Sequence, residues 1–201
     1  MNQLRTVISA TGSFIPTVAV PNDAFLGRDF RSADGKPIDK SNAIILEQFQ
    51  AITGIRERRY VTDDQVNSEI AAEAAGRALE SSGIDRESID AIIVAHNFGD
   101  VRAGTRRSDM VPSLAARVKH RLKIAKPETV AWDVVFGCPG WLQGVIIAHS
   151  MIRAGDARRV MVIGAETLSR ISDPHDRDSL IYADGAGAAI LERVDTDEPV
   201  G

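Results

Sequence analysis

The chain has 201 residues, of which 44% are hydrophobic, a formal net charge of −4 and a single cysteine. This length and apolar content allow a sizeable core, and the negative charge gives no sign of a nucleic-acid partner. One cysteine excludes an internal disulfide and fits a reducing compartment. Because there is neither a signal-peptide pattern nor an apolar run long enough to cross a bilayer, we expect a cytoplasmic protein without a membrane partner.

The first half of the chain alternates between strand and helix patterns. The expected elements are a strand at 4–11, an irregular polar excursion at 22–42, helices at 44–51 and 63–82, and a strand at 91–95. The second helix begins at Asp63 or Asp64, either of which can cap it, carries a stripe of alanines and ends at Gly83. The continuous apolar run of the second strand predicts burial on both faces.

The second half continues the alternation. The expected elements are a helix at 112–122, a strand at 129–136, a helix from Pro139 to near Gly155, a strand at 159–165, a polar loop at 166–178 and a last strand within 181–191. The order β-α-β-α-β-α-β-β predicts an α/β fold with a mostly parallel five-stranded sheet covered by helices.

Three arginines in four positions, Arg56, Arg58 and Arg59, allow two interpretations. They have the charge to bind an anion. They also fit a charged connector after a helix that stops at Gly54.

Cys138 lies where a strand pattern turns into a helix pattern, in the sequence Gly137-Cys138-Pro139-Gly140. Proline suits the first position of a helix, where its missing N–H costs nothing. The unpaired N–H groups and the positive end of the helix dipole favour a thiolate, and they can also hold an oxyanion. Cys138 is therefore a candidate nucleophile, although a lone cysteine is more often a small buried hydrophobic residue.

Other polar positions give weaker signals. His96 and Asn97 follow a buried strand, at the edge where α/β sheets often build sites, but the sequence alone favours a structural hydrogen-bonding role for them. His175 has no partner at metal-ligand spacing, so no metal is expected. The glycines after Asp184 precede a strand instead of a helix, which argues against a nicotinamide cofactor.

Several motifs, in this order, resemble the β-ketoacyl-acyl-carrier-protein synthases III of the thiolase fold. They are Gly12-Ser13-Phe-Ile-Pro16, Thr53-Gly-Ile-Arg-Glu-Arg-Arg59, Pro112-Ser113, Cys138 with Gly140, Val-Ile-Gly-Ala-Glu166, Asp173-Pro-x-Asp-Arg177 and Asp184-Gly-Ala-Gly-Ala188. The resemblance implies that residues 1–194 form an N-terminal thiolase-like domain. Residues 195–201 are then expected to be a linker to an absent C-terminal half.

The resemblance also implies an activity. Cys138 is expected to take an acyl group from a thioester of coenzyme A or a carrier protein. Condensation with malonyl-acyl-carrier-protein, with loss of carbon dioxide, then gives 3-oxoacyl-acyl-carrier-protein for fatty acid or polyketide-type biosynthesis, without a cofactor. Leu168, Arg177 and Tyr182 are the implied substrate-binding residues. The His and Asn that assist decarboxylation in the family are expected beyond residue 201, so the chain alone is expected to be inactive.

Two positions depart from the better-known members of the family, which have Trp and Arg beside the coenzyme A adenine. Here these positions are Gln48 and Ile52. We therefore expect a starter other than acetyl-coenzyme A, with Phe25 and Phe30 of the excursion as candidate contacts at the substrate entrance. We also expect a homodimer, formed through a sheet edge that carries the last strand, 183–191.

Three alternatives remain open at this point. The chain is also compatible with a starter acyltransferase that does not condense, or with a non-catalytic subunit that supports a dimer. A cysteine hydrolase is the least consistent, because no His-Asp pair is placed to activate Cys138.

Overall fold

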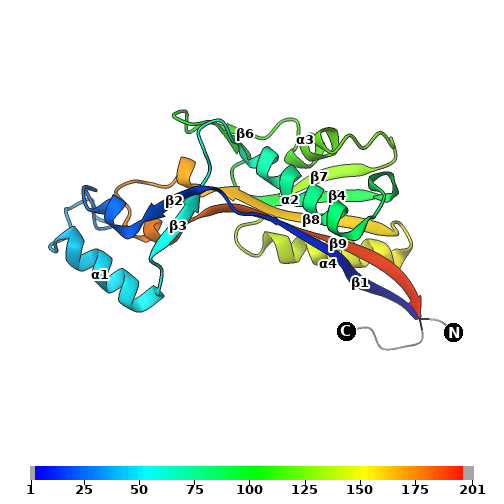
Figure 1. Cartoon of the computed structure of the whole chain (residues 1–201), viewed down its shortest axis with the longest axis horizontal. Helices are drawn as coiled ribbons and strands as arrows, with labels where there is room; N and C mark the ends of the chain where they lie inside the picture. The colour runs from blue at the N-terminus through cyan, green and yellow to red at the C-terminus, as the bar shows by residue number, and fades with distance from the viewer. Residues whose placement is uncertain (1–2, 197–201) are drawn as a thin grey trace.

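The computed structural model describes residues 3–196. Its main sheet has five strands, which lie in the order β1 (Gln3–Phe14), β9 (Asp184–Thr196), β8 (Arg159–Thr167), β4 (Ala91–His96) and β7 (Val130–Val135). Strand β4 is parallel to β7 and β8, and β9 is antiparallel to β8 and β1, so four strands run one way and only β9 opposes them (Figure 1). The predicted α/β class and mostly parallel five-stranded sheet are confirmed.

Helices cover both faces of this sheet. Helices α2 (Asn67–Ser82) and α3 (Leu114–Arg121) lie on one face and α4 (Gly140–Ala154) lies on the other (Figure 1). Successive residues of β4 point to opposite faces, so Ile92 packs in the α2 and α3 core while Ile93 packs in the α4 core. Both are fully buried, as the continuous apolar run predicts.

The alanine stripe of α2 lets the helix backbone approach the sheet closely. Ala71, Ala74, Ala75 and Ala78 are fully buried. A Cβ atom at Gly12 of β1 would lie 2.3 Å from the carbonyl oxygen of Ala74. A side chain at this position does not fit, so glycine and alanines together set the spacing between helix and sheet.

Helix boundaries agree with the predicted ones to within about two residues, except at the amino end of α2. Gly54, Gly83 and Gly155 follow α1 (Asn42–Thr53), α2 and α4 in left-handed conformations, with φ of 72°, 67° and 85°. The prediction that Asp63 or Asp64 caps α2 is wrong, because the helix begins later, at Asn67. A distant carboxylate replaces the local cap: Asp100 accepts hydrogen bonds from the N–H and hydroxyl groups of Ser68.

A smaller unit adjoins the carboxyl ends of the parallel strands. It contains the short strands β2 (Val18–Pro21) and β3 (Glu57–Tyr60), the 3-10 helices η1 (Asn22–Phe25) and η4 (Arg177–Ile181), and α1. Phe25 and Phe30, each 4% exposed, form its core with Ile45, Leu46 and Leu180. The prediction that these two phenylalanines line a substrate entrance is therefore wrong: the excursion buries them to hold itself together.

Arg58 lies inside this unit and is 4% exposed. Its guanidinium donates to the carbonyl oxygens of Leu180 (3.1 Å) and Val20 (3.2 Å) and to Oδ1 of Asn22 (2.7 Å). It also lies over the Phe25 ring. Arg58 thus serves the structure and does not bind an external anion, and Arg59 is paired with Glu57.

The shorter elements complete the chain and correct one further prediction. They are η2 (Arg86–Ser88), β5 (Asp100–Val101), β6 (Ser108–Asp109) and η3 (Leu168–Arg170). Strand β9 lies between β1 and β8, so the prediction of a dimer edge at the last strand is wrong; the edges of the main sheet are β1 and β7. Of the expected linker, residues 195 and 196 belong to β9 and the rest lie outside the described residues.

Candidate functional site

Cys138 is exposed in the turn between β7 and α4. Gly137 has φ of 77°, a left-handed conformation that glycine adopts without strain, and α4 begins at Gly140. The predicted strand-turn-helix setting is present, and the thiol is not a buried core residue. The backbone N–H of Cys138 makes no hydrogen bond with the described residues.

Small residues allow the start of α4 to pack closely against the neighbouring strands β4 and β8. A Cβ atom at Gly140 would lie 3.2 Å from the Cβ of Ala95 in β4, and one at Gly164 in β8 would lie 3.3 Å from the Cβ of Trp141. The start of α4, which directly follows the Cys138 turn, is therefore held against β4 and β8.

His96 has a structural role on the other face of the sheet. Its Nδ1 accepts a hydrogen bond from the N–H of Gly99 at 3.0 Å, and its other ring nitrogen is Nε2. This nitrogen is 3.0 Å from Oδ2 of Asp133, although the N–H is not aligned for a hydrogen bond. Asp133 accepts from the N–H groups of Leu114 (2.7 Å) and Ala115 (2.8 Å), and it thereby caps α3.

Asn97 lies beside Glu166 on the α4 face. The Asn97 N–H and Nδ2 both donate to Oε2 of Glu166, at 3.0 Å and 2.5 Å. Burial raises the pKa of Glu166, while the bonds from Asn97 act in the opposite direction. These two polar side chains come from adjacent strand ends, and only Asn97 was singled out by the sequence pattern.

A cavity of about 600 Å³ lies between α1 and η4. It brings together Gln48, Ile52, Arg177 and Tyr182, which the resemblance had placed at the thioester entrance. Leu168, on η3, is not among the described residues that line it. Sequence reasoning missed Ile38 and Phe49; the helical spacing of Ile45, Phe49 and Ile52 on α1 was the available signal.

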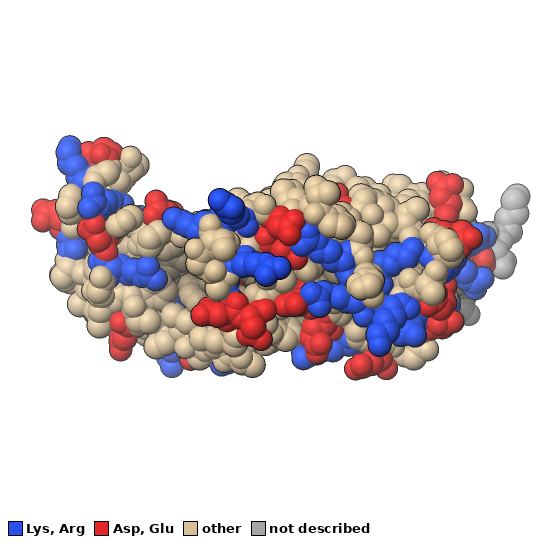
Figure 2. Space-filling view, turned by 90° about the horizontal axis from the view of Figure 1, so that it is seen from above, with Lys and Arg blue, Asp and Glu red and all other residues tan. Residues whose placement is uncertain are grey.

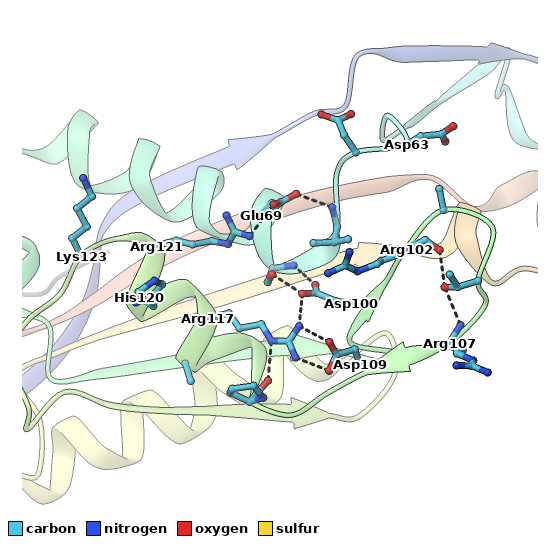
Figure 3. Close-up of a pocket in the computed structure, with 17 residues that line it drawn as sticks. Asp63, Glu69, Asp100, Arg102, Arg107, Asp109, Arg117, His120, Arg121 and Lys123 are labelled. Atoms are coloured by element: carbon cyan, nitrogen blue, oxygen red, sulfur yellow. Dashed lines mark hydrogen bonds and ion pairs between the residues drawn. The ribbon is translucent and has the colours of Figure 1, made fainter.

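A hollow of about 1260 Å³ lies between α2, α3 and the loop that carries β5 and β6. Several of its charges pair with each other: Arg117 contacts Asp100 and Asp109, and Arg121 contacts Glu69 (Figure 3). Lys, Arg, Asp and Glu are interspersed on this face, without a large region of one sign (Figure 2). We interpret this hollow as a structural ion-pair network.

The described residues contain no group of three or more His, Cys, Asp and Glu side chains that could hold a metal ion. The Nδ1 atom of His175 lies 2.8 Å from the carbonyl oxygen of Asp29. No helix of the described part is long and apolar enough to cross a membrane.

Comparison with known proteins identifies relatives for almost the whole chain. The family model of 3-oxoacyl-[acyl-carrier-protein] synthase III matches residues 132–200. The β-ketoacyl-[acyl-carrier-protein] synthase III of Novosphingobium aromaticivorans is 37% identical over 196 residues, which are 97% of this chain and 53% of the relative. Its counterpart from Neisseria meningitidis serogroup B is 37% identical and covers 94% of this chain and 52% of the relative.

Solved structures agree with this relationship. The 3-oxoacyl-[acyl-carrier-protein] synthase III of Aquifex aeolicus superposes with a TM-score of 0.75 and 30% identity, over 94% of this chain and 54% of that one. The synthase III of Thermus thermophilus gives 0.72 and 31%, over 93% and 51%. The chain spans about half the length of the curated relatives it matches. Sequence and fold together show that the chain belongs to the β-ketoacyl-[acyl-carrier-protein] synthase III family, whose members have a thiolase-like fold.

Proposed function

We propose that this chain supplies the acyl-accepting cysteine of a decarboxylative condensing enzyme. The observation that carries the proposal is the exposed position of Cys138 on the turn before α4. The helix dipole and the unpaired N–H groups at this end favour the thiolate. A core position, the main alternative for a lone cysteine, does not apply.

In the proposed first step, the thiolate of Cys138 attacks the carbonyl carbon of an acyl thioester. The free N–H of Cys138 is a candidate donor to the oxyanion that forms. The carrier thiolate leaves and takes up a proton, and the acyl group remains on Cys138.

In the second step, malonyl-acyl-carrier-protein loses carbon dioxide. The resulting carbanion attacks the acyl-Cys138 carbonyl, the Cys138 thiolate leaves, and 3-oxoacyl-acyl-carrier-protein forms.

We propose that residues 1–194 are the N-terminal domain of a longer enzyme and that the residues assisting decarboxylation lie in its second half. The outer face of α4 supports this, because Leu142 and Ile146 are 55% and 50% exposed. A helix at the centre of a site rarely leaves such an apolar face in water. A second half that packs there would also enclose Cys138.

The cavity between α1 and η4 is the proposed entrance for the thioester carrier. Arg177 offers a cation and Tyr182 an aromatic ring, while Gln48 and Ile52 supply neither the second ring nor the second cation. Losing one face of an adenine sandwich weakens binding by roughly tenfold. We therefore propose a starter other than acetyl-coenzyme A, delivered as a longer acyl-coenzyme A or on a carrier protein.

A homodimer is proposed through β7, the open edge of the main sheet, in place of the last strand. Val130 and Val135 at its ends are 50% and 55% exposed, and Phe136 beyond it is 56% exposed. An apolar edge of this kind is an aggregation hazard unless a second strand covers it. The exposed thiol fits a cytoplasmic location, where cysteines stay reduced.

The test compares this chain with the full reading frame that contains it. Both are incubated with an acyl-coenzyme A panel and malonyl-acyl-carrier-protein, and 3-oxoacyl product is measured by mass spectrometry. Product is expected only from the longer protein, and Cys138→Ala should abolish it. Undiminished condensation by the alanine variant would refute the proposal. Acylation of Cys138 without condensation in the longer protein would favour a starter acyltransferase.

A further inference from the structure

Glu166 and Asn97 form a polar pair at the ends of two adjacent parallel strands, β8 and β4. Both hydrogen bonds from Asn97 end on one oxygen of Glu166, Oε2. The other oxygen, Oε1, makes no hydrogen bond with the described residues. The carboxylate is thus fixed in position but keeps one oxygen available.

The strand register places this pair two residues beyond the positions of β4 and β8 that contact the start of α4. Alternate residues of β4 and β8, among them Ile93 and Val162, face α4. Two residues further along, Ala95 and Gly164 touch Gly140 and Trp141, the first residues of the helix. Two more residues, about 6.6 Å of strand, lead to Asn97 and Glu166. Because α4 runs opposite to these strands, this step leads past its first residue to the turn that holds Cys138.

The charges around Glu166 come from several elements. Burial raises the pKa of Glu166 most, the Asn97 bonds and the field of His96 lower it, and Asp184 of β9 raises it. A carboxyl group ordinarily ionises about four pH units below a thiol. Both hydrogen bonds from Asn97 donate to Oε2, and this arrangement favours the negatively charged form of Glu166.

We propose that Glu166, fixed by Asn97, is a positioning residue whose negative charge opposes the thiolate of Cys138 in the resting protein. The proposal rests on the function of Cys138 proposed above. The helix dipole favours the thiolate and the charge of Glu166 opposes it, so the two effects on Cys138 act in opposite directions. Such restraint protects a thiol on the surface from oxidation, because only the thiolate is strongly nucleophilic.

The test uses the single cysteine of this chain. The rate of Cys138 alkylation by iodoacetamide is measured from pH 5.5 to 10 for the parent chain, Glu166→Gln, Glu166→Ala and Glu166→Asp. A nearby like charge changes an ionisation equilibrium by about threefold to tenfold at intermediate dielectric. Both neutral variants should therefore react about threefold to tenfold faster at pH 7, with unchanged rates at high pH, and Glu166→Asp should follow the parent.

Glu192→Gln is the matched control. Glu192 is also a half-buried carboxylate of the same sheet, paired with Arg159 at the opposite end of β8. The Glu192→Gln substitution should leave the pH profile of Cys138 alkylation unchanged. Alkylation profiles of both neutral variants that superimpose on that of the parent would overturn the proposal, as would an equal acceleration by Glu192→Gln. Far-UV circular dichroism checks the folding of each variant. If one of the two neutral variants fails to fold, the other still provides the test.

The result separates this proposal from that for Cys138 itself. If Cys138 fails to accept an acyl group in the full reading frame, the condensing function is wrong. The difference between the alkylation profiles of the parent and of the neutral Glu166 variants does not depend on acyl transfer, so it tests the proposed restraint in either case.

Discussion

Gly12 shows how one absent side chain sets the distance between α2 and the sheet. A Cβ atom at Gly12 would lie 2.3 Å from the carbonyl oxygen of Ala74 and 2.5 Å from the backbone nitrogen of Ala78, both in α2. Backbone atoms cannot move aside as a flexible side chain can, so α2 itself would have to shift.

Gly12→Ala should therefore lower the free energy of unfolding by about 3 kcal/mol, the upper part of the range for overpacking. Gly187→Ala is the control, because Gly187 lies on the neighbouring strand opposite Ser13 and a Cβ there meets no atom within 4 Å. Urea unfolding of both variants is the measurement. If the two substitutions lowered the free energy of unfolding equally, the close contact at Gly12 would not be the cause of the loss.

At the scale of elements, an ion-pair network joins α2, α3, β5 and β6. Arg117 of α3 donates to Asp100 (2.7 Å), whose carboxylate also caps α2, and to Asp109 (2.7 Å) of β6. The hydrogen bonds from Arg117 hold the pKa of Asp109 below its ordinary value of 3.8. A lowered pKa means that the stability contributed by Asp109 is complete above about pH 4 and is lost as the pH falls further.

Asp109→Asn should accordingly be less stable than the parent at pH 7, and this difference should shrink between pH 4 and pH 3. The measurement is the free energy of urea unfolding at each pH, with the exposed Asp39→Asn as a charge-matched control. A difference that stays constant down to pH 3 would be inconsistent with the network.

The sequence predicts where the helices and strands lie along the chain better than it predicts which of them pack together. The apolar runs at 91–95 and 159–165 read as buried strands, and glycines mark the helix ends, because burial and backbone conformation leave local patterns. No local pattern shows that β9 inserts between β1 and β8, that Asp100 caps a helix 32 residues earlier, or that Phe25 packs beside Leu180. Cys138 was identified because its strand, turn and helix are contiguous, whereas Glu166 emerges only when two strand ends meet.

At the scale of the whole molecule, two apolar surfaces require partners. The main sheet ends at β7 on one side (Figure 1). Leu142 and Ile146 on the outer face of α4 are 55% and 50% exposed. We expect the first to pair with a second copy and the second to be covered by the other half of the longer protein.

Light scattering of the full reading frame at micromolar concentration should accordingly give the mass of a dimer. Val130→Lys places a charge at the β7 edge and should weaken the dimer, while Ile8→Lys, at an exposed site on β1, should not. A monodisperse monomer would refute the proposed dimer.

The central claim, that Cys138 is the acylated nucleophile, is tested most directly by the intact mass of the full reading frame after exposure to a panel of acyl thioesters. The account predicts a mass increase of one acyl group, mapped to the peptide that contains Cys138, absent from Cys138→Ala and larger in yield for longer or carrier-bound acyl groups than for acetyl-coenzyme A. Acylation that persists in Cys138→Ala, or no acylation by any thioester, would contradict it.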